Sequence, residues 1–132
     1  TEGRAKDDNE NYKIMIVMTD GQNTYTTYDN FNKSMYGAFG YVAMDHLGTT
    51  SSNNWTVVSK MNDKTKTACT NAKADGILIY TVAFKVSDST TRQLLKDCAT
   101  RYDMAFESDS NSDLIATFQR IAQDISMLRI AE

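Results

Sequence analysis

KIMIVMTDGQNT, residues 13–24, is an apolar run that stops at an aspartate, a glycine and a group of amide and hydroxyl side chains. Such a near-continuous apolar run is typical of a strand covered on both faces, as in a parallel sheet. Ligands of open α/β sheets bind beyond the carboxyl ends of the strands. We therefore expect Asp20 at the edge of a sheet where a ligand could bind, although Asp-Gly is also a common turn dipeptide.

Strands and helices alternate along most of the chain. Apolar runs predict strands at 14–19, 77–84 and 104–107, and helical spacing with capping residues predicts helices at about 65–75, 89–102 and 112–128. Alternation of this kind indicates a parallel sheet with right-handed crossovers. The expected fold class is α/β, as a partial Rossmann-like three-layer sandwich.

Two segments lie outside this pattern. Residues 1–12 are polar and without periodicity, which predicts a linker or loop that belongs to a longer protein. Residues 22–64 form an aromatic-rich insertion, for which we expect a helix at about 32–47 and a loop at 48–63. Its aromatic rings would form either a recognition surface or a small core of their own, with Tyr36 and Phe39 buried and Trp55 exposed. The partner-binding candidates are Asn23, Thr24, Tyr25 and Trp55.

The composition excludes some classes of function. The chain has 132 residues and a formal net charge of −3, and its basic residues are scattered. A nucleic-acid footprint needs a basic face, so no nucleic-acid partner is expected. No apolar run approaches the ~20 residues that a membrane-spanning helix requires. A membrane anchor is therefore expected only outside this chain.

Three stretches together resemble the second half of a von Willebrand factor A-type domain. They are IMIVMTDGQNT, ACTNAKADGILIYTVAF and LLKDCATRYDMAFESDSNSDLIATFQRIAQDISMLRIAE, which cover most of the chain from Lys13 onward. More narrowly, the ordered set is similar to the TadG-like proteins of tight-adherence (Flp) pilus assembly. The resemblance implies an A-type sheet with helices on both sides, with residues 13–132 as the C-terminal part of the domain.

The resemblance also implies a role for Asp20. Family members with an intact metal-ion-dependent adhesion site (MIDAS) use three loops, and Asp20 matches the aspartate of the third, in the Thr-Asp-Gly turn. The Asp-x-Ser-x-Ser signature of the first loop is not found, and no residue matches the second-loop threonine. No cofactor is therefore expected in this fragment, whereas Mg²⁺ or Mn²⁺ is compatible with the full-length protein.

Cys69 and Cys98 are the only cysteines, and their spacing matches no zinc pattern. If the strands lie in sequential order, the two cysteine-bearing helices are neighbours on one face of the sheet. The resemblance implies a periplasmic or extracellular setting, in which disulfides persist. It also implies anchoring to the inner membrane by an upstream segment. A Cys69–Cys98 disulfide and two buried thiols remain alternatives at this stage.

The first functional hypothesis is a non-enzymatic adhesion or assembly module of the cell envelope. It would bind a protein partner, a pilus or envelope component, through a metal site completed by upstream residues. The alternative is a metal-dependent hydrolase or phosphotransferase with Asp20 as catalytic carboxylate and Asp88 or Glu107 as a second acid. A structural half-domain without a ligand is the third reading. The oligomeric state is open, since a free sheet edge can pair with another copy.

Overall fold

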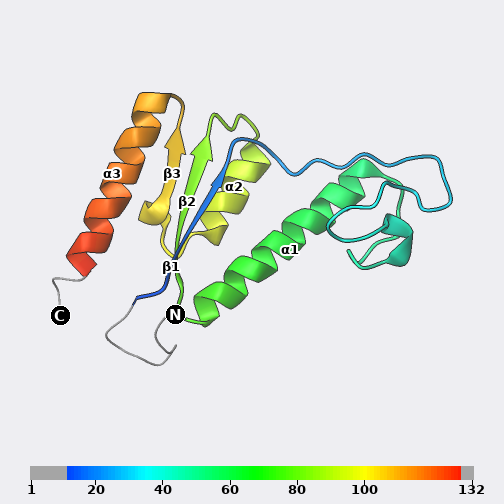
Figure 1. Cartoon of the computed structure of the whole chain (residues 1–132), viewed down its shortest axis with the longest axis horizontal. Helices are drawn as coiled ribbons and strands as arrows, with labels where there is room; N and C mark the ends of the chain where they lie inside the picture. Colours follow the sequence, from blue (N-terminus) through cyan, green and yellow to red (C-terminus); the bar gives the residue numbers. More distant parts are fainter. Residues whose placement is uncertain (1–11, 129–132) are drawn as a thin grey trace.

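The computed structural model describes residues 12–128 of the chain, in which strands and helices alternate (Figure 1). The predicted linker at 1–12 lies almost entirely outside the described residues. The strands are β1 (Ile14–Thr19), β2 (Leu78–Phe84) and β3 (Ala105–Ser108). The helices are α1 (Asn54–Ala74), α2 (Ser89–Cys98) and α3 (Asn111–Leu128), with short 3-10 turns at Val42–Met44 and Tyr102–Met104.

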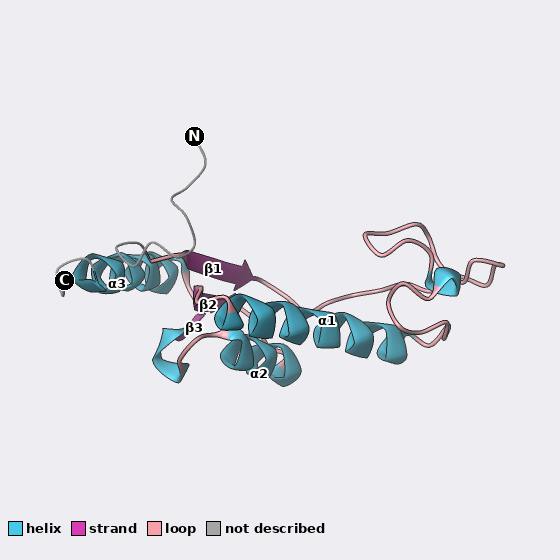
Figure 2. Ribbon diagram, turned by 90° about the horizontal axis from the view of Figure 1, so that it is seen from below, coloured by secondary structure: helices cyan, strands magenta, loops and turns pink. Residues whose placement is uncertain are grey.

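Within the described residues, the sheet has three strands in the order β1-β2-β3, and both pairs of neighbours are parallel. Helices α1 and α2 cover one face and α3 covers the other, which gives three layers (Figure 2). This arrangement confirms the predicted α/β class and the sequential strand order. It also places the carboxyl ends of all three strands along one edge of the sheet.

The central strand β2 supplies the core on both faces, because its side chains alternate between them. Toward α3, Tyr80 and Val82 pack against Met104 and Ile121. Burial raises the pKa of the Tyr80 hydroxyl, and the nearby Asp124 carboxylate raises it further. Burial on both faces explains why the run from 77 to 84 is almost entirely apolar in sequence.

Toward α1 and α2, Ile79 packs against Cys69 and Cys98, and Ala83 packs against Leu95. Thr81 is the one polar residue of β2, and it is completely buried. Its hydroxyl donates a hydrogen bond of 3.0 Å to the carbonyl of Leu95, which satisfies the buried group.

Helix α1 begins eleven residues before the predicted start at 65, so the expected loop at 48–63 is wrong over most of its length. The side chain of Asn53 caps the helix by accepting hydrogen bonds from the backbone N–H groups of its second and third residues. Val57 is fully buried against Val42 and Leu47. This tertiary burial stabilises a first turn in which β-branched residues alone would disfavour a helix.

The helix predicted at about 32–47 is also wrong. The segment forms two isolated antiparallel bridges and the short turn at Val42–Met44. Gly37 and Gly40 form two backbone hydrogen bonds with each other. Gly40 has a φ of 75°, which glycine adopts without strain. The hydroxyl of Ser34, a buried residue, accepts a hydrogen bond from the Val42 N–H group. These local bonds replace the helical ladder.

Of the three predictions about the burial of aromatic residues in the insertion, two are wrong. Tyr36 is 72% exposed and Phe39 is 37% exposed, so the expectation that both are buried is wrong. Trp55 is 85% exposed, as predicted. The small core of this region is instead aliphatic, with Tyr25 packed at its margin.

One edge of the sheet is formed by β1, which pairs only with β2 among residues 12–128. Ile16 and Met18 point to the α3 face of the sheet, since they are in register with Tyr80 and Val82. They remain 42% and 46% exposed. Helix α3 therefore leaves the β1 side of this face partly uncovered.

Candidate ligand-binding edge of the sheet

Asp20 follows β1 at the carboxyl edge of the sheet, and its side chain is exposed. The turn is held by Thr19, whose hydroxyl donates to the Gly21 carbonyl at 2.7 Å and accepts from the Gly21 N–H group at 3.3 Å. Within residues 12–128, no hydrogen bond or ion pair engages the Asp20 carboxylate. The oxygen atoms of Asp20 are therefore available to a ligand from the solvent side.

Asp88, the first of the two other acids considered from the sequence, caps α2. Its carboxylate accepts hydrogen bonds from the N–H group of Thr91 at 2.6 Å and from the Thr91 hydroxyl at 2.7 Å. These hydrogen bonds lower the pKa of Asp88 below its ordinary value. The carboxylate is thus ionised and already used in starting a helix.

Glu107, the second acid, lies on β3 and pairs with two basic residues of α2. Its carboxylate is 2.8 Å from Lys96 and 3.6 Å from Arg92. The hydrogen bond from Lys96 is the main reason that the pKa of Glu107 is lowered and that of Lys96 is raised. Both acids have structural partners, and no three His, Cys, Asp or Glu side chains among the described residues gather as a metal would require.

A cavity of about 340 Å³ opens beside this edge. It lies between the loop after β1, the first half of α1 and the start of α2. All four partner-binding candidates from the sequence line it, and so do residues of the two helices. These four candidates are Asn23, Thr24, Tyr25 and Trp55. The structure therefore brings the four predicted residues together, whereas Asp20 is not part of the lining.

Sequence reasoning missed the wall of the cavity that α1 provides. Asn54, Val58, Ser59 and Asn62 line the cavity at helical spacing, together with Trp55. The available signal was Asn53, an N-cap residue placed directly before this periodic series. The loop expected at 48–63 leaves no place for this wall.

Hydrogen bonds hold the loop after β1 against α1. The Asn23 amide donates to the Asn62 side-chain carbonyl at 2.8 Å. The Asn54 side-chain carbonyl accepts from the N–H group of Thr27 at 3.1 Å and from its hydroxyl at 2.9 Å. These three hydrogen bonds join residues 27 and 39 positions apart in sequence, so they tie the loop to the cavity wall that α1 provides.

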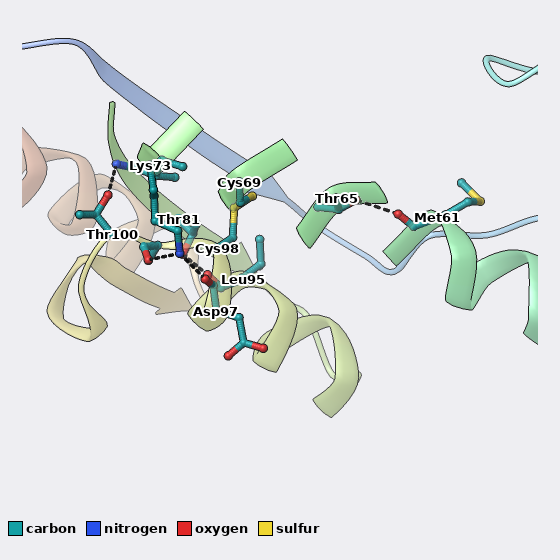
Figure 3. The surroundings of a disulfide bond; sticks show 11 residues. Met61, Thr65, Cys69, Lys73, Thr81, Leu95, Asp97, Cys98 and Thr100 are labelled. Atoms are coloured by element: carbon teal, nitrogen blue, oxygen red, sulfur yellow. Dashed lines mark hydrogen bonds between the residues drawn. A yellow bond between two sulfur atoms is a disulfide. The ribbon is translucent and has the colours of Figure 1, made fainter. Parts of the chain in front are cut away.

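Cys69 of α1 and Cys98 of α2 form a disulfide, with their Cα atoms 5.2 Å apart (Figure 3). Both residues are buried against Ile79. Close to the bond, the Lys73 ammonium donates to the backbone carbonyls of Asp97, at 2.7 Å, and of Ala99, at 3.3 Å. The disulfide and the lysine together fasten α1 to the C-terminal end of α2.

None of the helices described between residues 12 and 128 combines the length and the apolar character that crossing a bilayer requires. Comparisons with protein-family models, with curated proteins and with solved structures each gave no match. The structure therefore defines this protein as a small α/β domain with a parallel sheet. This architecture is compatible with a Rossmann-like or A-type fold.

Proposed function

We propose that the chain is the C-terminal part of a von Willebrand factor A-type module in a TadG-like protein of tight-adherence pilus assembly. In this proposal the module is not an enzyme. It binds a protein component of the pilus or envelope on the periplasmic or extracellular side. The ordered sequence motifs support the family, and the parallel sheet with helices on both faces is compatible with it.

The observation that carries the proposal is the state of Asp20 beside the open edge of β1. The carboxylate is exposed and unengaged within residues 12–128, and Ile16 and Met18 are partly uncovered on the same strand. Buried parallel sheets are normally covered on both faces. A further strand and its crossover, supplied by another segment of the polypeptide, would cover these side chains and bring more oxygen ligands beside Asp20.

A hard divalent cation such as Mg²⁺ or Mn²⁺ suits this edge, because it prefers carboxylate and hydroxyl oxygens with water in the remaining positions. Asp20 would contribute one carboxylate oxygen, and residues upstream of this chain would complete the coordination. A single carboxylate gives little affinity. The described residues therefore supply one ligand of the site rather than the site itself.

The alternative of a metal-dependent hydrolase or phosphotransferase has less support. Such chemistry needs a second acid, a base or a nucleophile close to Asp20. Asp88 caps α2 and Glu107 is paired with Lys96, so each has a structural role. A binding role for Asp20 requires neither of them.

Calorimetric titration with Mn²⁺ tests the proposal on two proteins, the 132-residue chain and the longer polypeptide that includes the residues encoded before Thr1. We expect micromolar binding only to the longer protein, and its loss in Asp20→Ala. Asp97→Ala is the matched control, because Asp97 lies near the far end of α2. Micromolar binding to the 132-residue chain that Asp20→Ala abolishes, or binding to the longer protein that Asp20→Ala leaves intact, would contradict the proposal.

A hydrolysis assay with p-nitrophenyl phosphate and Mn²⁺ tests the enzymatic alternative. We expect no turnover above the background set by Asp20→Ala. Turnover that the wild-type protein shows and Asp20→Ala lacks would replace the binding function by catalysis.

A further inference from the structure

We propose that the cavity beside the sheet edge binds a neutral, polyhydroxylated ligand, namely a short saccharide chain. Asp20 is not among the residues that line the cavity. The inference therefore does not depend on the metal site or on the family proposed above. It depends on the chemistry of the lining and on the groups that the fold leaves free there.

The polar lining of the cavity is almost entirely neutral. Apart from the Asp88 carboxylate, it consists of side-chain amides and hydroxyls, and among the described residues no Lys, Arg or His contributes to it; the amides are Gln22, Asn23, Asn54 and Asn62. An anionic ligand would find no positive charge in this lining. A cationic ligand would find one carboxylate, Asp88, which already accepts two hydrogen bonds from Thr91. The lining thus favours an uncharged ligand.

Amides both donate and accept hydrogen bonds, as the hydroxyl groups of a saccharide also do. Within residues 12–128, the bond from Asn23 to Asn62 leaves the Asn62 NH₂ group and the Asn23 carbonyl oxygen without another partner. In the same range, the bonds from Thr27 to Asn54 leave the Asn54 NH₂ group without a partner. These donors and acceptor are held in place before a ligand arrives, which reduces the entropy cost of binding.

The apolar part of the lining is aromatic at its rim. Trp55 is 85% exposed, although its backbone is fixed in the first turn of α1 by the Asn53 cap. Tyr25 lines the same cavity. Tyr and Trp combine an apolar ring with one polar group, which suits a ligand that is apolar on one face and hydrated on the other. The C–H face of a sugar ring has this character, and the volume of about 340 Å³ lies in the range of ligand pockets.

An extended, uncharged peptide of a protein partner is the competing occupant, because its backbone also donates and accepts hydrogen bonds. It would place its side chains against Trp55 in the same way. The saccharide is favoured because four amides supply hydrogen bonds in several directions, which matches hydroxyl groups around a ring better than the two-sided pattern of a strand.

Trp55 is the single tryptophan of the chain, so its fluorescence reports directly on the cavity. The probes are cellotetraose, chitotetraose and maltotetraose, titrated in the presence of EDTA so that no metal contributes. Trigalacturonate, an uncharged Ser/Asn-rich peptide and an arginine-containing peptide are titrated in parallel. We expect a saturable change in emission with at least one neutral oligosaccharide and none with the other three probes.

Variants connect the response to the cavity. Asn62→Ala should weaken binding by at least about tenfold, which equals ~1.4 kcal/mol. Calorimetry should show binding retained in Trp55→Phe and lost in Trp55→Ala. Phe31→Ala is the control and should bind like the wild type, since Phe31 is 95% exposed in the same insertion but does not line the cavity. Circular dichroism of each variant verifies its helical content.

Three outcomes would overturn the inference. Saturation by the uncharged peptide without saturation by any neutral oligosaccharide would assign the cavity to a protein partner. No response to any probe, or equal loss of saccharide binding in Phe31→Ala and Trp55→Ala, would show that the cavity is not a saccharide site. None of these outcomes affects the metal proposal, because EDTA is present throughout.

Discussion

Removing the disulfide between Cys69 and Cys98 should lower the free energy of unfolding by about 3.6 kcal/mol. The two residues are 29 positions apart. In the chain-entropy model, a cross-link over this separation removes ~12 cal/mol/K from the unfolded state, which at 298 K gives the value above. With a urea m-value of ~1.5 kcal/mol/M, the midpoint of unfolding should fall by ~2.4 M.

Urea denaturation followed by circular dichroism measures this difference. The comparison is between the oxidised protein and the same protein in reductant, because the two thiols stay buried against Ile79 and only the cross-link changes. The double variant Cys69→Ala/Cys98→Ala should lose somewhat more of the free energy of unfolding, since it also leaves small cavities beside β2. A difference below ~1 kcal/mol between the unfolding free energies of oxidised and reduced protein would contradict this prediction, as would two titratable thiols in the air-oxidised protein.

Three further predictions concern local bonds. Ser108→Ala should cost about 1–2 kcal/mol, because it leaves the buried Thr117 hydroxyl without its 3.0 Å partner; adding Thr117→Val should recover part of this loss in urea denaturation. Asn53→Ala should cost about 1 kcal/mol by removing the cap of α1, whereas Asn53→Asp should cost less in the same assay. Glu107 pairs with Lys96 and has a lowered pKa, so it should stabilise the fold fully above pH 4.5 and lose this effect as the pH falls through its lowered pKa. The melting temperature of Glu107→Gln should therefore lie below that of wild type at neutral pH and converge with it in acid; a gap that persists in acid would contradict the assignment.

The candidate metal ligand and the cavity share one edge of the sheet but differ in what they need. Asp20 needs ligands from outside residues 12–128 before it can hold a cation with useful affinity. The cavity is lined by residues of this chain, and the hydrogen bonds of Asn23 and Asn54 to their partners hold its wall together. Saccharide binding should therefore be measurable on the 132-residue chain, whereas tight metal binding should not.

Local sequence patterns are sufficient to predict the three strands, the alternation of strands with helices, and the position of Asp20 at the end of β1. Each of these depends on local patterns of burial, which repeat along a strand or a helix and are visible in the order of residues. The sequence also predicts the exposure of Trp55, because the neighbours of this residue are polar. The segment 78–84 is mostly apolar, because β2 is covered on both faces, and its polar residue Thr81 is buried.

The start of α1, the burial of the aromatic rings in the insertion and the existence of the cavity depend on tertiary contacts. The first turn of α1 is stabilised by burial of Val57 against residues that precede it by ten or more positions, which local propensity cannot show. The cavity depends on a hydrogen bond between Asn23 and Asn62, 39 residues apart. Contacts over such separations arise from the packing of whole helices and strands, so local sequence patterns do not predict them.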